Sequence, residues 1–341
     1  MGQNTRQVGL QSVLIDTPVF IRASASIVGK KEGEGPLGEF FDKTGTDDLF
    51  GAKTWEDAES SLQKEAVTLA MEKAELSAKE IRYLLAGDLL GQSIATSFGL
   101  MQFDIPLFGL YGACSTCGES LSLGSMLLAG GFADHVVCVT SSHFASAEKE
   151  FRFPLGYGSQ RPMAASWTVT GSGAFVLSTD SGKRNAPRIT GITTGKIVDY
   201  GIKDTFNMGC AMAPAAADLI RQHLQDFNRE ATDYDKIITG DLGTVGKTAL
   251  MDLLKEYQID IAPVHMDCGI EMFDSEKQGT DAGGSGCGCC AATLSAYILR
   301  KLEKGDWKRV LFIPTGALLS KTSFNEGKAV PGIAHGVVIE A

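Results

Sequence analysis

The sequence is poor in aromatic and in basic residues. Aromatic side chains make up 8% of the 341 residues, and 31 lysines and arginines stand against 41 aspartates and glutamates, a formal net charge of −10. Binding to nucleic acid requires clustered Lys and Arg, and the densest basic cluster here is the pair Lys183 and Arg184. We therefore expect no nucleic-acid partner. With 40 glycines, the composition favours tight loops around a buried sheet over an aromatic-rich sandwich.

The sequence also lacks a long apolar run and a recognisable signal peptide. A helix needs about 20 apolar residues to cross a bilayer, and no stretch of the chain has this length. The eight cysteines are therefore expected to be reduced thiols, because disulfides are mainly a feature of secreted proteins. Gly2 opens a myristoylation-like sequence, but Arg6 stands where that motif has Ser or Thr. We expect any membrane contact to depend on a partner.

Motifs for metals and cofactors are absent as well. Cys114 and Cys117 form a lone Cys-x-x-Cys pair, and Cys287, Cys289 and Cys290 are too close together for the usual zinc spacing. The glycine loops have neither the lysine of a phosphate-binding loop nor the spacing of a dinucleotide-binding motif. We therefore expect no metal and no cofactor.

What the sequence does contain is the same order of elements twice. A strand ending in Gly-Asp, a glycine-rich turn with cysteine, and an apolar strand recur at residues 80–89 and 231–242, 112–117 and 286–290, and 136–140 and 310–315. This repetition predicts an α/β fold of two pseudo-symmetric halves rich in βαβ units, residues 1–185 and 186–341, packed as one body. The boundary falls in the linker-like segment 180–187.

Local signals mark individual elements and one unusual loop. Thr54 is expected to cap a helix that ends near residue 73. Ser77-x-x-Glu80 is a capping box, and Thr232-x-x-Asp235 resembles one. Residues 143–166 form a long irregular segment without a counterpart in the second half, and such loops are often functional.

Cys114 lies in a Gly-Ala-Cys-Ser turn between a short apolar strand and an apolar helix. A thiol at a helix N-terminus experiences the positive end of the helix dipole, which favours the thiolate and suits a nucleophile. A small buried hydrophobe at a crowded turn explains the same residue. The spacing leaves both interpretations open.

Runs of residues along nearly the whole chain carry a resemblance to known proteins. They are residues 35–38, 41–44, 85–90, 112–116, 140–143, 168–174, 212–218, 282–287, 315–320 and 333–338. Through them the chain resembles the thiolase and ketoacyl synthase superfamily, and more closely the stage V sporulation protein AD family. The resemblance implies a thiolase-like fold of the five-layer type with buried mixed sheets. It also implies a homodimer in which strand 135–140 pairs with its copy.

The resemblance further implies a function in sporulation. Members of the family are expected to bind dipicolinic acid, pyridine-2,6-dicarboxylate, as a component of a spore membrane uptake system. The implied partners are other membrane subunits of that system, and the implied location is the forespore, peripherally on the inner membrane. The bound form, free dipicolinate or its calcium chelate, is left open.

The chain departs from the condensing enzymes of the superfamily. Gly240 stands where a catalytic His is expected, and the loop 283–286 offers no Asn. Thiolysis and condensation need a base and an electrophilic hole, so we expect a binding protein without enzymatic activity. Two alternatives are an acyltransferase, with Cys114 acylated and His143 or His335 as base, and a scaffold with a vestigial pocket.

The resemblance gathers the candidate ligand-binding residues in one cleft. They are Cys114, His143, Arg152, Gly173, Asp241, Gly284 and His335. One ligand carboxylate is expected at the helix start near Cys114, and the other is expected to meet the 143–166 loop through Arg152 or Arg161.

Four further polar residues have simpler interpretations. Asp88 and Asp241 occupy equivalent positions, each after a glycine at the end of a strand. Each either caps the following turn or faces a shared pocket. His135 and His223 are expected to face solvent.

Overall fold

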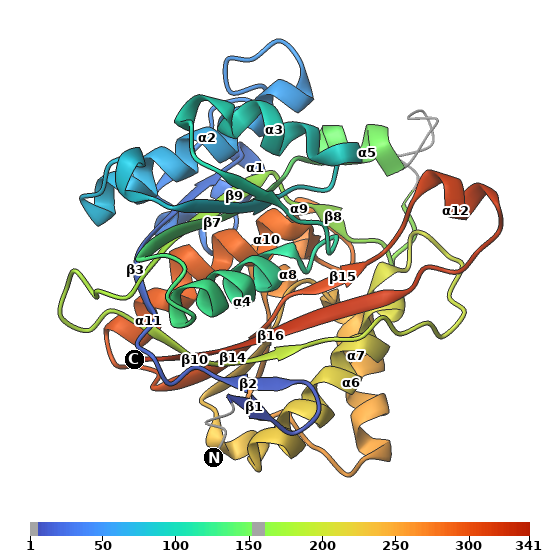
Figure 1. Cartoon of the computed structure of the whole chain (residues 1–341). Coiled ribbons are helices and arrows are strands. Elements are labelled where there is room, and N and C mark those ends of the chain that lie inside the picture. Colours follow the sequence, from blue (N-terminus) through green and yellow to red (C-terminus); the bar gives the residue numbers. More distant parts are fainter. Residues whose placement is uncertain (1–5, 152–160) are drawn as a thin grey trace.

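The structure, a computed structural model, describes residues 6–151 and 161–341 (Figure 1). Arg152 lies outside the described residues. Two mixed sheets and three layers of helices alternate, which confirms the predicted five-layer, thiolase-like α/β fold. No helix in the described ranges is both long enough and apolar enough to cross a membrane.

The main path of the first sheet runs through five strands of the first half, and the short β4 (Lys43–Thr44) pairs with β3 outside this path. Its order is β6 (Leu107–Gly109), β5 (Tyr83–Gly87), β7 (His135–Ser142), β9 (Gly171–Ser178) and β3 (Phe20–Val28). Strand β5 runs parallel to β6 and β7, whereas β9 is antiparallel to both β7 and β3.

The second sheet repeats this arrangement. Its order is β12 (His265–Asp267), β11 (Lys236–Thr239), β14 (Arg309–Ile313), β16 (Gly332–Glu340) and β10 (Arg188–Thr194). Strand β11 is parallel to β12 and β14, and β16 is antiparallel to β14 and β10. The same directions therefore recur in the same order, and the sheets join where β3 and β10 pair.

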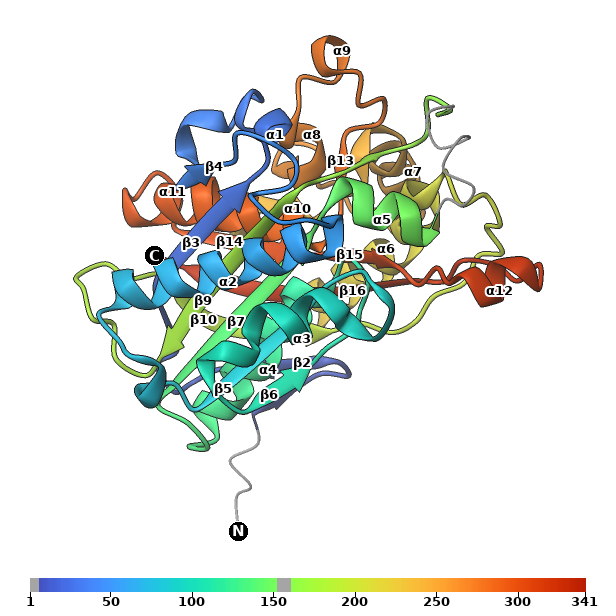
Figure 2. The ribbon, with the colours of Figure 1, turned by 90° about the horizontal axis from the view of Figure 1, so that it is seen from above.

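Helices fill the three remaining layers. α4 (Thr116–Ala129) and α10 (Cys287–Thr293) lie between the sheets. α2 (Trp55–Ala74) covers β3, β9 and β7 from outside, as Figure 2 shows, and α3 (Ile94–Leu100) packs on it. On the opposite side, α6 and α7, which span 208–227 and 243–256, cover the second sheet in the same way.

The sequence explains why α2 forms where it does. The Thr54 hydroxyl accepts a hydrogen bond from the Asp57 amide at 3.1 Å, as expected of an N-cap. Ala58, Leu62 and Ala66 recur at helical spacing and are fully buried against the first sheet. The Ser77–Glu80 capping box is also present.

Two local predictions were wrong. The capping box of the second half joins Glu230 to Asp233 and not Thr232 to Asp235, so the turn begins two residues earlier. His223 is fully buried and not solvent-facing, because its ring contacts the Thr193 hydroxyl and the Tyr234 hydroxyl, each at 2.6 Å.

The prediction that strand 135–140 pairs with its copy in a dimer was also wrong. β7, which contains residues 135–140, pairs with β5 on one side and β9 on the other, so it has no free edge. Within the described residues, β6 pairs only with β5, and its Leu107 and Phe108 are exposed. A homodimer that extends the sheet would therefore use β6.

We predict that replacing Phe108, which is 47% exposed, with Lys weakens such a dimer, because the edge then carries a repelling charge. Light scattering is expected to give about 72.4 kDa (2 × 36.2) for the unmodified protein and 36.2 kDa for the variant. Phe324→Lys, at a comparably exposed site on a distant helix, is the control and is expected to stay dimeric. A monomeric unmodified protein at micromolar concentration contradicts the proposal.

Candidate functional site

The turn that carries Cys114 connects β6 to α4 and is held by its own side chains. The Ser115 hydroxyl donates to the Gly112 carbonyl at 2.6 Å, and the Thr116 hydroxyl donates to the Ala113 carbonyl at 2.7 Å. Ala113 has a φ of 51°, which is uncommon for a residue with a side chain. Cys114 itself is 5% exposed and packs with Leu89 and Cys287. The thiol is therefore at a helix start but enclosed.

Asp241 reaches the same place from the second half. Its carboxylate accepts hydrogen bonds from the Ser285 hydroxyl at 2.7 Å, the Gly286 amide at 2.9 Å and the Thr315 hydroxyl at 2.7 Å. The Ser285 Oγ lies 3.9 Å from the Cys114 Sγ. Burial raises the pKa of Asp241 to about 6, although these hydrogen bonds oppose the shift.

Asp88 and Asp241 differ in role despite their equivalent positions. Asp88 accepts from the amides of Leu90 and Thr96, both at 2.8 Å, so it fixes the turn after its own strand. In the second half, Asp267 accepts from the amides after Asp241, those of Leu242 and Gly243. Asp241 is thereby left to bind Ser285 of its own half, whose hydroxyl in turn lies against Cys114 of the first half.

These surroundings make Cys114 a poor nucleophile. Burial and the neighbouring Asp241 carboxylate raise the pKa of the Cys114 thiol well above its usual value. The thiolate, not the thiol, is the nucleophile.

The expected bases are also poorly placed. At Gly240, a Cβ would lie 3.0 Å from the Pro314 Cα and the Thr315 N, so a His there would require the backbone to shift. His335 lies against α4 near Gly118, and burial lowers its pKa to about 4.

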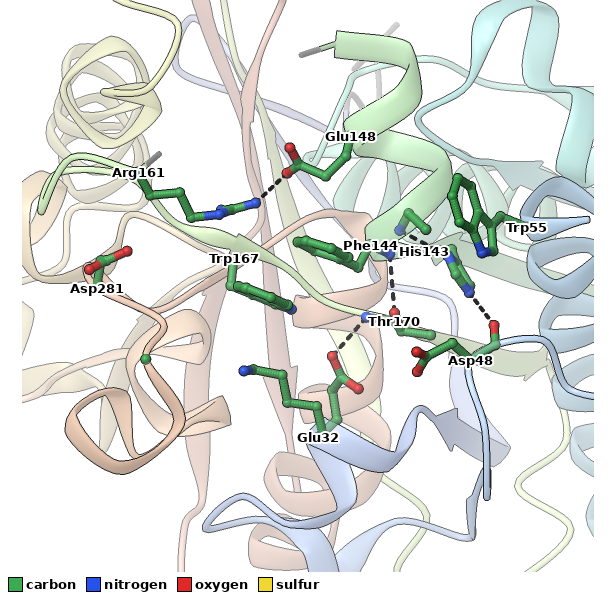
Figure 3. Close-up of a pocket in the computed structure, with 13 residues that line it drawn as sticks. Glu32, Asp48, Trp55, His143, Phe144, Glu148, Arg161, Trp167, Thr170 and Asp281 are labelled. Atoms are coloured by element: carbon green, nitrogen blue, oxygen red, sulfur yellow. Dashed lines mark hydrogen bonds and ion pairs between the residues drawn. The ribbon is translucent and has the colours of Figure 1, made fainter. Parts of the chain in front are cut away.

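The second notable region is a cavity of about 860 Å³, lined mainly by the first half and closed on one side by the second (Figure 3). Its walls come from α1 (Lys30–Gly33), residues 48–55, the start of α5 (Phe144–Phe151), residues 161–170 and residues 279–281. This volume is in the range of small-molecule pockets.

Aromatic and cationic side chains meet in this cavity. Phe144 and Trp167 stack with ring centroids 3.9 Å apart and an interplanar angle of 6°. The Lys31 Nζ lies 4.1 Å from the centroid of the Trp167 ring and donates to the Gln278 carbonyl at 2.6 Å. Arg161 lies over the same ring and pairs with Glu148 at 2.5 Å, with both side chains buried.

His143 holds two walls of the cavity together. Its Nε2 donates to the Asp48 carbonyl at 2.7 Å, and its Nδ1 accepts from the Ala145 amide at 3.1 Å. Burial lowers the pKa of His143, so the ring is neutral. Because both nitrogens already have partners, this geometry gives His143 no free nitrogen to act as a base.

The candidate residues thus lie in two neighbouring regions, the surroundings of Cys114 and the cavity. Cys114 and Asp241 meet at Ser285, whereas His143 lies in the cavity. Gly284 belongs to β13 (Gly284–Ser285), which pairs with β8 (Trp167–Thr168) and so connects the two regions. Gly173 faces α10, where a Cβ would lie 2.5 Å from the Ala291 carbonyl. Sequence reasoning missed Lys31, Glu32 and Trp167, although Trp167 is one of only three tryptophans.

We predict that Cys114 reacts slowly with iodoacetamide in the native protein at pH 8, because its thiol is buried and its pKa is raised. Half-buried Cys210 is the internal reference and is expected to react at least about tenfold faster, measured by peptide mass spectrometry. Asp241→Asn is expected to speed modification of Cys114 by removing the adjacent charge. Equal rates at Cys114 and Cys210 contradict this description of the site.

Comparison with solved structures identifies the fold. Cerulenin-bound OleA of Xanthomonas campestris matches with a TM-score of 0.60 and 16% identity, over 96% of this chain and 100% of that one. The 3-oxoacyl-[acyl-carrier-protein] synthase III of Aquifex aeolicus matches with a TM-score of 0.57 and 13% identity, over 95% and 100%. At these identities the likeness establishes the thiolase-like fold alone.

Sequence comparison is more specific. The family model of stage V sporulation protein AD matches residues 9–340. Stage V sporulation protein AD of Bacillus subtilis (strain 168) is 45% identical over 332 residues, which cover 97% of each chain. The chain therefore belongs to the stage V sporulation protein AD family of sporulation proteins and has a thiolase-like fold.

Proposed function

We propose that this sporulation protein binds dipicolinic acid, and that the ligand occupies the cavity lined by Lys31, Trp167 and Arg161. Family membership supports a role in sporulation, and the resemblance described above supplies the ligand. We further propose that the protein serves a spore uptake system and associates with the forespore inner membrane through its membrane subunits.

The ammonium group of Lys31 is the observation that carries the proposal. It has three N–H donors, and the carbonyl of Gln278 accepts one of them. No carboxylate of the described residues forms an ion pair with it, although it is partly buried over the Trp167 ring. A partly desolvated cation of this kind is well suited to receive a ligand carboxylate.

The remaining walls suit a planar ligand. Aromatic faces favour a flat ring, and Trp55 adds a further aromatic side chain to the Phe144–Trp167 pair. Arg161 contributes a second positive charge, partly neutralised by Glu148. The cavity also contains Asp48 and Asp281, and the calcium chelate of dipicolinate, which is neutral overall, would not be repelled by them.

The surroundings of Cys114 are less suitable for an anion. Its neighbours are the Asp241 carboxylate, the Ser285 hydroxyl and the apolar side chains of Leu89 and Cys287. The amides of Ser115 and Thr116 already donate to backbone carbonyls within the turn. A ligand carboxylate there would gain no free donor from these two amides and would be repelled by ionised Asp241.

We predict that Lys31→Gln weakens dipicolinate binding about 10- to 100-fold by isothermal titration calorimetry, the loss expected for one charge-assisted contact. Lys30→Gln is the matched control, because Lys30 is adjacent, exposed and 3.9 Å from Glu34. Cys114→Ser is expected to bind normally. Unchanged binding in Lys31→Gln, with loss in Cys114→Ser, would place the ligand at Cys114 instead.

We also propose that the protein is not an acyltransferase, since burial and Asp241 raise the pKa of the Cys114 thiol and both ring nitrogens of His143 already have partners. Incubation with acetyl-CoA at pH 8 is expected to leave the intact mass of the protein unchanged. A mass increase of one acetyl group that is absent in Cys114→Ser would favour the enzymatic alternative.

A further inference from the structure

Glu32 is a buried acid in the wall of the same cavity. It follows Lys31 in α1, and its side chain is 1% exposed. The Oε1 atom accepts a hydrogen bond from the Thr170 amide at 2.9 Å. The Oε2 atom is buried and has no hydrogen-bond partner among the described residues. Figure 3 shows the side chain extending from α1 toward Thr170, with its second oxygen on the side of Asp48.

An unpaired oxygen at such a position is costly in the ionised state. A buried carboxylate oxygen without a hydrogen-bond donor loses its hydration and gains no hydrogen bond that would compensate for the loss. Burial accordingly raises the pKa of Glu32 to about 7, opposed by the hydrogen bond from Thr170. Around neutral pH the group therefore holds a proton in much of the population, and this proton has no acceptor among the described residues.

We infer that Glu32 is a specificity-determining residue of the cavity, which in its protonated form donates a hydrogen bond to a carboxylate of the bound ligand. This inference rests on the proposed function. Lys31 and Glu32 are adjacent on α1, so a charged and a neutral donor line the same wall. An aromatic dicarboxylate supplies acceptors for both, whereas an aromatic ligand without carboxylates would leave the Glu32 proton unpaired.

Binding then involves a proton as well as the ligand. A ligand anion near Glu32 disfavours its ionised form and raises its pKa further, so the complex takes up a proton wherever the free protein has lost it. Above about pH 7, one linked proton lowers the affinity by up to about tenfold per pH unit.

Several other charged or titratable groups surround Glu32 and need to be separated from it. On its own turn these are Lys30, Lys31 and Glu34; on the other walls of the cavity they are Asp48, His143, Glu148, Arg161 and Asp281. Asp48 is the main competitor, because its carboxylate contributes to the raised pKa of Glu32. His143 has both ring nitrogens engaged, and Arg161 with Glu148 forms an ion pair.

The test is calorimetric titration of the full-length protein with dipicolinate at pH 6, 7 and 8, in buffers of different ionisation enthalpy. The unmodified protein is expected to take up close to one proton at pH 8 and much less at pH 6. Glu32→Gln places an amide donor where the protonated acid stood. This variant is expected to bind within a few-fold of the unmodified affinity at pH 6, more tightly than it at pH 8, and without proton uptake.

Two matched variants serve as controls. Glu34→Gln, on the same turn but exposed, and Asp48→Asn are expected to retain the proton uptake. Proton uptake that persists in Glu32→Gln, or that disappears in Asp48→Asn alone, overturns the assignment of the linked proton to Glu32. The proposal that the protein binds dipicolinate is unaffected by either result. Absence of binding at every pH refutes the proposed function, and the inference with it.

Stability without ligand gives an independent readout. The pKa of Glu32 is higher in the folded protein than its ordinary value of 4.5, so its contribution to stability is lost as pH rises from there through about 7. We compare the free energies of unfolding of Glu32→Gln and the unmodified protein in urea at pH 6 and pH 8. The stability of the variant relative to the unmodified protein is expected to be higher at pH 8 than at pH 6. A pH dependence identical in both proteins contradicts a protonated Glu32.

Discussion

The two helices in the middle of the molecule are covered by a sheet on each side, and this constraint shapes the rest of the structure. α10 packs so closely on the first sheet that a Cβ on Gly288 would lie 2.3 Å from the Gly171 carbonyl. Space this limited admits Gly, Ala, Ser and Cys. It accounts for Gly288 and for the buried Cys287, Cys289 and Cys290 of α10, which serve as compact hydrophobes.

The same constraint determines the chemistry at the centre. A helix start that in open surroundings would activate a thiol is here enclosed, and burial outweighs the helix dipole. Asp241, which is held by Ser285 and Thr315 of its own half, adds a repelling charge beside the Cys114 thiol. At this centre the halves are joined by hydrogen bonds from the Thr140 hydroxyl to the Cys287 carbonyl and from the Gly288 amide to the Ser142 hydroxyl. The cavity, assembled from loops beyond the strand ends, provides cations, aromatic faces and space.

Much of the fold could be predicted from the sequence because its signals are local. The repeated motifs predicted two equivalent halves, and Thr54 marked the start of α2. Strand neighbours were harder, because β9 follows the long 143–166 segment and its insertion beside β7 depends on tertiary contacts. His223 was misplaced for a similar reason: its partners Thr193 and Tyr234 become visible only when β10 and the 231–234 turn close around it.

The candidate site was predicted in part. Cys114 and Asp241 do meet at Ser285, as the resemblance implied. Lys31 and Trp167 were missed because more than 130 residues separate them (167 − 31 = 136). Their meeting depends on the short pairing of β8 with β13 and on the loop that returns Gln278 to α1. Single-sequence patterns carry no signal for contacts of this range.

The central claim is that the ligand site is the peripheral cavity and not the enclosed thiol. A crystal structure of the protein with dipicolinate tests this most directly. The account predicts ligand density beside Trp167, with one carboxylate within hydrogen-bond distance of the Lys31 Nζ and another acceptor beside the Glu32 Oε2. Ligand density on Cys114 and Asp241, with the cavity holding only solvent, would contradict it.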